Sequence, residues 1–433
     1  MKLWSKDKTN TAEQIESFTV GNDREFDLLM ASYDVQGSIA HVTMLGEQGL
    51  MSTEDAHAAV KELRRIKDEI HSGNFKIDSS AEDIHSQIEF MLTERIGHIG
   101  KMIHTGRSRN DQVALDIKLY LRAAIQDIKV EIIDLFDLLI QKSNEHKEIL
   151  LPGYTHLQIA MPSSVGLWLG AYAESLVDDM EFLAAAYRVT NKNPLGSGAG
   201  YGSSFPLNRK RTTELLGFET LNFNSVYAQM SRGKTEKLVS MALASFAATL
   251  SRLSMDCCLY MNQNFGFIHF PDELTTGSSI MPHKKNPDVF ELIRGKCNRI
   301  QAAPNELTLL INNLPSGYHR EMQLTKEILF PAIQGLRSCI AMMKLMISNM
   351  GFNSNILEDP KYQYLFSVEK VNELVNQGIP FRDAYKQVGE SIESGNFQFD
   401  ASKGLTHTHE GSIGNLCHEE IRAEMQKISS AIA

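Results

Sequence analysis

The chain has 433 residues and a formal net charge of −10 at pH 7. This length can bury a large core, while the acidic balance, without a long run of Lys or Arg, argues against nucleic acid as a partner. The five cysteines form no CxxC pair, so we expect a reduced protein without a disulfide framework.

The N-terminal segment MKLWSKDKTNTAEQ contains no apolar stretch of signal-peptide length, so we do not expect secretion. The most apolar segment, residues 238–250, ends before Arg252 and is shorter than the ~20 residues that span a bilayer. We therefore expect a helix buried inside a protein, no membrane partner and a cytoplasmic location.

Long helices are expected through most of the chain. All 12 prolines lie at or after Pro152, so nothing forces the preceding residues to break a helix. Residues 236–263 are apolar on nearly every face, which is typical of a helix central in a bundle. Between residues 111 and 141, apolar residues recur at helical spacings: Ile117, Leu121, Ala124, Ile128, Ile132, Leu135 and Leu139. The sequence predicts an all-α fold, with domains at 1–104, 105–355 and 356–433.

Two segments that flank the long 111–141 helix carry reactive or charged side chains. HTGRSRND (104–111) places Ser108, Arg109 and Asn110 just before the helix, a cationic and amide-rich set suited to carboxylates. LPGYTHLQIAMPSS (151–164) is expected to be a loop, and its His156 can act as an acid or base near neutral pH. The alternatives are a helix start with solvated arginines and an ordinary surface histidine.

TTGSSIMPHKKNPDVFELIRGK (275–296) predicts a mobile loop that leads into a helix. Asn286 is expected to cap that helix. The loop then lies near free backbone N–H groups and the ammonium groups of Lys284 and Lys285, where an anion is stabilised. Such surroundings could also help the Ser278 hydroxyl to ionise. The alternative is a solvated turn with a good helix cap.

Taken together, these motifs resemble the fumarase/aspartase superfamily and, within it, the branch of the argininosuccinate lyases and delta-crystallins. The pattern Gly-Ser-Ser-Ile-Met-Pro-x-Lys-x-Asn-Pro at 277–287 is the superfamily signature, and the paired lysines resemble this branch. The other segments that match in order and spacing are HTGRSRNDQVALD (104–116), GYTHLQIAMP (153–162), NPLGSGAG with FPLNR (193–209), and DVFELIRGK (288–296).

The resemblance implies a fold, an assembly and a reaction. The fold would be a long central helical bundle of the fumarase/aspartase type, with smaller helical N- and C-terminal domains. The assembly would be a homotetramer whose active sites are each built from three chains, and no metal or cofactor is implied. The reaction would be the elimination of argininosuccinate to arginine and fumarate.

The resemblance also implies roles for individual residues. Ser278 would be the base and His156 the acid-side group, oriented by Glu291. Lys284 and Asn286 would stabilise the charge that develops on the substrate. The residues that would hold the substrate are Asp27, His85, Ser108, Arg109, Asn110, Thr155, Arg232, Tyr318, Gln323 and Lys326.

Several positions depart from the pattern of the branch. His283 stands where Gln is usual, YAQMSRGK (227–234) keeps only Arg232 of its expected residues, and Asp23 replaces a Ser. Two alternatives remain open: a superfamily lyase with another leaving group (an adenylosuccinate lyase, aspartase or fumarase), and a crystallin-like structural protein without activity. HTHE (407–410) is expected to be a turn or helix cap rather than a metal site.

Overall fold

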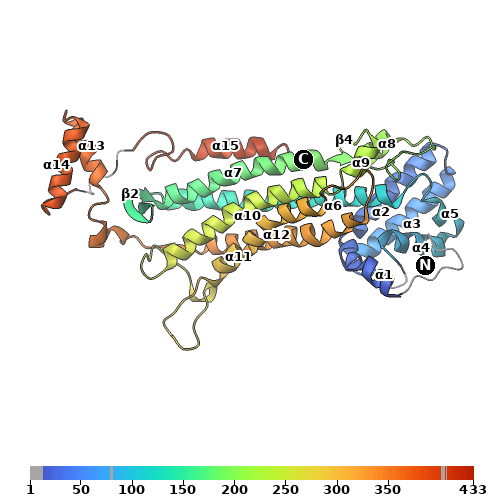
Figure 1. Cartoon of the computed structure of the whole chain (residues 1–433), viewed down its shortest axis with the longest axis horizontal. Helices are drawn as coiled ribbons and strands as arrows, with labels where there is room; N and C mark the ends of the chain where they lie inside the picture. The colour runs from blue at the N-terminus through green and yellow to red at the C-terminus, as the bar shows by residue number, and fades with distance from the viewer. Residues whose placement is uncertain (1–12, 79–80, 401–404, 406) are drawn as a thin grey trace.

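The computed structural model describes residues 13–78, 81–400, 405 and 407–433, and most of the N-terminal segment considered above for secretion lies outside them. The molecule is an elongated helical bundle with the N-terminal helices at one end and α13 and α14 at the other (Figure 1). The α-helices are α1 (Glu13–Val20), α2 (Asp23–Glu47), α3 (Thr53–His71), α4 (Ile84–Ile96), α5 (His98–Met102), α6 (Arg109–Glu145), α7 (Val165–Thr190), α8 (Arg209–Leu215), α9 (Ser225–Met230), α10 (Lys234–Met261), α11 (Asp288–Leu310), α12 (Thr325–Ser348), α13 (Ser367–Asn376), α14 (Phe381–Glu393) and α15 (His418–Ser429).

The remaining elements are short. The strands are β1 (Leu150–Thr155), β2 (Gln158–Ser164), β3 (Lys192–Asn193), β4 (Thr220–Leu221), β5 (Ile268–His269) and β6 (Gly351–Phe352), and the 3-10 helices are η1 (Asp272–Leu274), η2 (Arg320–Leu324), η3 (Ile356–Glu358) and η4 (Pro360–Tyr362). The strands form three separate pairs. The predicted all-α fold class is therefore confirmed, with these strand pairs as local exceptions.

The central bundle consists of α6, α7, α10, α11 and α12, which run along its length (Figure 1). The apolar stripe predicted on residues 111–141 is buried on α6 from Ile117 to Leu139. It forms part of one core that all five helices share. The helical spacing alone thus located the buried face of the longest helix.

The apolar helix expected at 236–263 is α10, and it packs against α7 and α11. Within the described residues, two helical segments, Lys234–Met261 and Arg320–Ser348, could span a membrane by length and composition, and the most apolar window of α10 is 50% buried within this single chain. Both belong to the shared core. The apolar residues that stay exposed on this part of the bundle include Met241, Met255, Leu292, Leu309, Met342 and Leu345.

The N-terminal helices α2, α3 and α4 have a separate apolar core, and α2 also packs on α6. Gly37 permits this approach, because a Cβ at this position would lie 2.6 Å from Cδ2 of Leu115 on α6. At the opposite end, α13 and α14 share a small core of their own. The chain then returns along α7, where Ile421 and Met425 of α15 join the central core. The domain boundaries near 104 and 355 stay a prediction.

Two local predictions were wrong. Residues 151–164 form the antiparallel hairpin β1–β2 rather than a loop. The sequence did not reveal this hairpin, because its turn contains no glycine and therefore gives no clear signal. Asn286 does not cap α11, which begins at Asp288 after Pro287. Asn286 instead pairs with Thr276 across the base of the loop. In HTHE, His407 contacts Glu369 at 3.0 Å, and the segment leads into a turn that begins at Glu410.

Candidate active site

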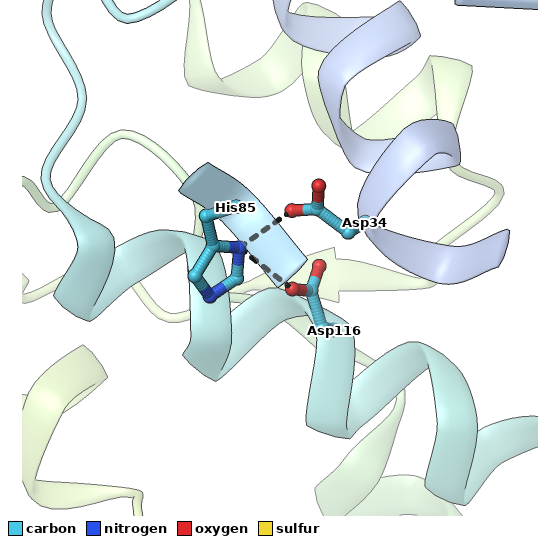
Figure 2. A group of neighbouring side chains, drawn as sticks. All are labelled: Asp34, His85 and Asp116. Carbon is cyan, nitrogen blue, oxygen red and sulfur yellow. Dashed lines mark hydrogen bonds and ion pairs between the residues drawn. The ribbon is translucent and has the colours of Figure 1, made fainter. Parts of the chain in front are cut away.

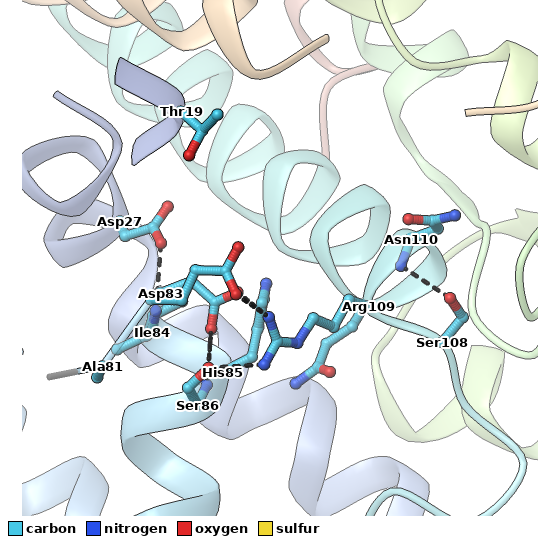
Figure 3. Close-up of polar contacts among 12 residues, drawn as sticks. Thr19, Asp27, Ala81, Asp83, Ile84, His85, Ser86, Ser108, Arg109 and Asn110 are labelled. Carbon is cyan, nitrogen blue, oxygen red and sulfur yellow. Dashed lines mark hydrogen bonds and ion pairs between the residues drawn. The ribbon is translucent and has the colours of Figure 1, made fainter. Parts of the chain in front are cut away.

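A cavity of about 250 Å³ opens where the N-terminal helices meet the start of α6 and the segment that leads into α12. Its wall carries both carboxylates and cations, so it suits a ligand with charges of both signs. Seven predicted site residues lie on this wall: Asp27, His85, Arg109, Asn110, Tyr318, Gln323 and Lys326. Figure 3 shows several of them around the first turns of α4 and α6.

The start of α6 is fixed by a capping box. Ser108 is the N-cap residue: its Oγ accepts from the Asn110 N–H at 3.2 Å, while its own N–H donates to Asp111 Oδ1 at 2.9 Å. This arrangement satisfies backbone donors that a helix start leaves unpaired. Ser108 therefore directs Arg109 and Asn110 toward the cavity from a rigid helix end.

Arg109 connects α6 to the start of α4 (Figure 3). Its Nη1 donates to Asp83 at 2.9 Å and to Glu82 at 3.2 Å, and its Nη2 donates to the Ser86 hydroxyl at 2.7 Å. The guanidinium group is thus held by several partners at the cavity wall. A carboxylate ligand would meet a cation that is already oriented.

Lys326 stands between two carboxylates, Asp23 and Asp27, on the cavity wall. Its Nζ donates to Asp27 Oδ1 at 2.7 Å and also pairs with Asp23, while Asp27 Oδ2 accepts from the Ile84 N–H at 3.2 Å. Burial, followed by the charge of Asp27, raises the pKa of Asp23 to about 6 despite the nearby ammonium group. At neutral pH two carboxylates therefore share one lysine, and this wall can accept a further cationic group.

Two other predicted residues lie near this wall. Gln323 donates to the carbonyls of Thr19 and Val20, both at 3.1 Å, and so ties η2 to α1. The guanidinium group of Arg232 is buried behind the wall, where its Nε donates to Glu236 at 3.1 Å. Arg232 does not line the cavity, but its charge lowers the pKa of Asp23. Its contact with substrate stays a prediction.

His156 lies at the tip of the β1–β2 hairpin. Thr155 pairs directly with Gln158, so the turn consists of His156 and Leu157, whose φ values are 55° and 59°. A left-handed conformation is strained for non-glycine residues and is often found where function requires it. The side chains of Thr155 and His156 are exposed, and Leu157 is 78% exposed. The hairpin tip therefore directs these three side chains toward solvent.

The loop of the signature sequence is closed at its base and exposed along its length. The Asn286 N–H donates to the Thr276 carbonyl at 2.8 Å, and the Asn286 side-chain amide donates to the Gly277 carbonyl at 3.2 Å. Within the loop, Ser278 Oγ accepts from the N–H groups of Ile280 and Met281 at 3.4 and 3.2 Å. Such donors would favour the ionised form of the hydroxyl.

The two lysines of this loop differ in their contacts. Lys285 pairs with Asp272 of η1, whereas the ammonium group of Lys284 has no ion pair among the described residues and is exposed. Lys284 is therefore the one whose charge remains available to a ligand. Glu291 lies in the first turn of α11, just beyond the loop, and is also exposed.

Within one chain the cavity, the tip of the β1–β2 hairpin and the signature loop do not meet. The α6 helix alone has 37 residues, and at ~1.5 Å per residue it extends about 55 Å between Arg109 and the segment that leads into the hairpin. In Figure 1 the β1–β2 hairpin and the N-terminal helices, which carry part of the cavity wall, lie toward opposite ends of the bundle, and the yellow loop before α11 projects from its side. The cavity, the hairpin tip and the loop are thus three incomplete sites.

Sequence reasoning missed an organising residue at the start of α6. Asp111 is fully buried, and its Oδ2 accepts from the N–H groups of Gly196 and Gly198, both at 2.9 Å. Burial raises the pKa of Asp111 to about 6, against these hydrogen bonds. Its position three residues after Ser108 is the spacing of a capping box, which is the signal that could have identified it. Two further buried carboxylates, Asp34 and Asp116, gave no local signal.

Comparison with known proteins gives the relationships of the chain. Residues 8–302 match a protein-family model described as "Lyase". The chain is 57% identical over 427 residues to the argininosuccinate lyase of Parabacteroides distasonis, an alignment that covers 99% of this chain and 95% of the relative.

Solved structures share the fold. A crystal structure of EDDS lyase in complex with formate has a TM-score of 0.79 at 22% identity, and the alignment covers 98% of this chain and 91% of the other. A class II fumarase from Schistosoma mansoni has a TM-score of 0.70 at 17% identity, with 88% and 91% covered. The helical bundle of the fumarase/aspartase type is thereby confirmed, and the chain belongs to the argininosuccinate lyase family.

Proposed function

We propose that this protein is an argininosuccinate lyase that cleaves argininosuccinate to L-arginine and fumarate, the last step of arginine biosynthesis. The observation that carries this function is the 57% identity to an argininosuccinate lyase along nearly the whole chain. The charged cavity is consistent with it, because the arginine part of the substrate carries an ammonium, a carboxylate and a guanidinium group.

The difficult step is removal of a proton from the carbon next to a carboxylate, because the resulting dianion is unstable in water. In our proposal the Ser278 alkoxide takes this proton, and the electron pair forms the C=C bond of fumarate as the C–N bond breaks. The N–H groups of Ile280 and Met281 that reach Ser278 Oγ support an ionised hydroxyl. Lys284 and Asn286 supply the positive charge and the hydrogen-bond donor that the dianion needs.

The departing guanidino nitrogen must gain a proton. His156 provides it directly or through water, and Glu291 orients the ring. The exposed hairpin tip with its left-handed backbone supports this role, since a ring that already projects from a rigid strand pair loses little freedom when it meets substrate. Ser108, Asn110, Thr155, Arg232 and Tyr318 are proposed to hold the substrate together with the other cavity residues.

We further propose that the enzyme is a homotetramer in which each site combines the cavity, the hairpin tip and the signature loop from three chains. The separation of about 55 Å along α6 supports sharing, because no single chain brings Arg109 and His156 together. The apolar residues left exposed on α10, α11 and α12 support burial between chains. The five free thiols support a reducing, cytoplasmic location.

Fumarate release by the purified protein tests the reaction. The assay follows the ultraviolet absorbance of fumarate with argininosuccinate, and in parallel with adenylosuccinate, aspartate and malate. We expect release from argininosuccinate alone. Release from another of these substrates would assign the chain to a different superfamily activity, and no release from any would favour a structural protein.

Subunit mixing tests the shared site separately. Ser278→Ala and His156→Asn subunits, each expected to keep about 1% of the activity or less, are unfolded, mixed in equal amounts and refolded. If the loop and the hairpin of a site come from different chains, about a quarter of the sites carry both intact groups, and activity returns to about that fraction. Ser278→Ala mixed with Lys284→Ala is the control, because both changes lie in the same loop and must not complement. Absence of recovery in the first mixture would contradict a shared site.

A further inference from the structure

A fully buried cluster lies directly behind the cavity wall. Asp34 of α2, His85 of α4 and Asp116 of α6 meet there (Figure 2). His85 Nδ1 contacts Asp34 Oδ1 at 2.8 Å and lies 3.7 Å from Asp116 Oδ2. Asp34 also accepts from the Gln112 side-chain amide at 2.7 Å. Three helices far apart in sequence thus place two carboxylates on one ring nitrogen.

The two carboxylates differ in the number of their hydrogen bonds. Asp34 Oδ2 and both oxygens of Asp116 are buried without a hydrogen-bond partner in the part of the chain that the structure describes. Burial without a partner is costly for a carboxylate, so their presence behind the cavity calls for a compensating charge. The imidazolium form of His85 supplies it at 2.8 Å from Asp34 Oδ1.

The protonation of His85 follows from these neighbours. Burial alone would lower its pKa, but the charge and hydrogen bond of Asp34, followed by the charges of Asp83 and Asp116, raise the pKa to about 9. Burial would raise the pKa of Asp34, but the charge and hydrogen bond of His85 lower it. Burial, followed by the charge of Asp34, raises the pKa of Asp116 well above its ordinary value, so Asp34 is the main counter-charge of His85. The other charged or titratable groups that act on the cluster include Asp83, Arg107 and His104.

A metal ion is a weaker occupant for the same three residues, although their ligand atoms lie within 4.8 Å of one another. A separation of 2.8 Å between Nδ1 and the Asp34 oxygen is that of a charge-assisted hydrogen bond. A coordinating His must be neutral, and a cation would also face Arg107, whose buried charge already acts on both carboxylates. The cluster therefore suits a proton better than a metal ion.

The second ring nitrogen of His85, Nε2, is the one that the two aspartates do not contact. His85 lines the cavity wall, and Figure 2 shows this nitrogen on the side of the ring opposite the two aspartates. Among the described residues no hydrogen bond to Nε2 is present, while Nδ1 is fully engaged. A protonated Nε2 is thus an unused cationic donor at the wall where Arg109 and Lys326 also lie.

We propose that Asp34 and Asp116 are positioning residues that keep His85 an imidazolium, so that its Nε2–H donates a charge-assisted hydrogen bond to a carboxylate of the substrate. This inference rests on the proposed function. The carboxylate can belong to the arginine part or to the succinyl part of the substrate. L-arginine and fumarate, used separately as product inhibitors, distinguish the two.

The test measures the inhibition constants of arginine and fumarate between pH 6 and pH 9. In the unaltered enzyme we expect no loss of affinity near pH 6.5. In Asp34→Asn, His85 loses its proton as the pH rises. If its pKa returns to the ordinary value of about 6.5, only ~3% of the ring stays charged at pH 8, and the constant for one product rises about 30-fold. Asp116→Asn, at the longer distance, should give a smaller rise.

Two controls separate this role from a structural one. Asp179→Asn removes another buried carboxylate, which lies on α7 and accepts from Thr249 Oγ1 at 2.6 Å. It should leave the pH dependence of both inhibition constants unchanged. In a His85→Gln background, Asp34→Asn should add no further pH dependence, because the ring through which it acts is gone.

Three outcomes would overturn the inference. The first is an unaltered enzyme that loses affinity for a product near pH 6.5, with this loss abolished by His85→Gln. The second is an affinity that does not change with pH in folded Asp34→Asn and Asp116→Asn, and the third is a stoichiometric divalent metal ion that His85→Gln removes. The first and third use no Asp34 variant, so they decide the question even if that variant does not fold. An unaltered enzyme without activity on argininosuccinate would instead contradict the proposed function. In that case the binding of fumarate and of arginine can still be measured by calorimetry, so the two failures can be distinguished.

Discussion

Replacing Lys326 by methionine should destabilise the protein strongly. The Lys326 side chain is 3% exposed, and its ammonium group lies between Asp23 and Asp27. Methionine keeps most of the length of this side chain but removes the ammonium group. Two carboxylates would then remain in a buried site without their cation. Breaking a buried ion pair by removing one partner typically costs about 3–5 kcal/mol, because the remaining charge is uncompensated.

Lys344 offers a matched control on the same helix. Its Nζ lies 2.7 Å from Asp134, a distance equal to that between Lys326 and Asp27, but the two side chains are 32% and 53% exposed. Exposed ion pairs contribute only about 0–1 kcal/mol. Lys344→Met should therefore change the urea midpoint little, while Lys326→Met lowers it substantially at the same protein concentration. Equal shifts for the two variants would refute the reasoning from burial.

The pH dependence of this difference has a definite sign. The pKa of Asp23 is already raised to about 6, and the Lys326 ammonium opposes that rise. Without Lys326 the pKa of Asp23 rises further, so the folded variant binds a proton at a pH where the unaltered protein does not. The variant thus regains stability relative to the unaltered protein as the pH falls from 8 to 5. A difference in unfolding free energy that stays constant over this range would contradict the explanation.

The remaining predictions concern catalysis and local structure. Ser278→Ala should lower fumarate release by about 100- to 10,000-fold with an unchanged melting temperature, and substantial residual turnover would exclude Ser278 as the base. His156→Asn should slow turnover about 100-fold or more without loss of melting temperature, because asparagine tolerates the left-handed conformation at this exposed turn; unfolding of this variant would instead indicate a structural role. Ser108→Ala should lower the free energy of unfolding by about 1 kcal/mol through loss of the α6 cap, and it should also reduce activity. Ser52→Ala, which removes the exposed cap of α3, should affect stability alone. Equal activity losses in the two variants would contradict a role for the α6 cap in the site.

Much of the candidate site was predictable because its signals are local. Ser108, Arg109 and Asn110 follow from a helix start, and the loop with Ser278 and Lys284 follows from a contiguous motif. Other parts were not predictable. The hairpin at His156 depends on the pairing of two strands through a turn without glycine, and the buried neighbours of His85 come from helices separated by many residues.

The sequence by itself determined the all-α class, the buried face of α6 and the family, because helical periodicity and contiguous motifs are properties of neighbouring residues. Only the tertiary structure decided which of these residues share a cavity. Asp27, His85, Arg109 and Lys326 lie on four segments whose approach depends on how α2, α4, α6 and α12 cross, and those crossings are set by packing between distant side chains, such as Leu115 against Gly37.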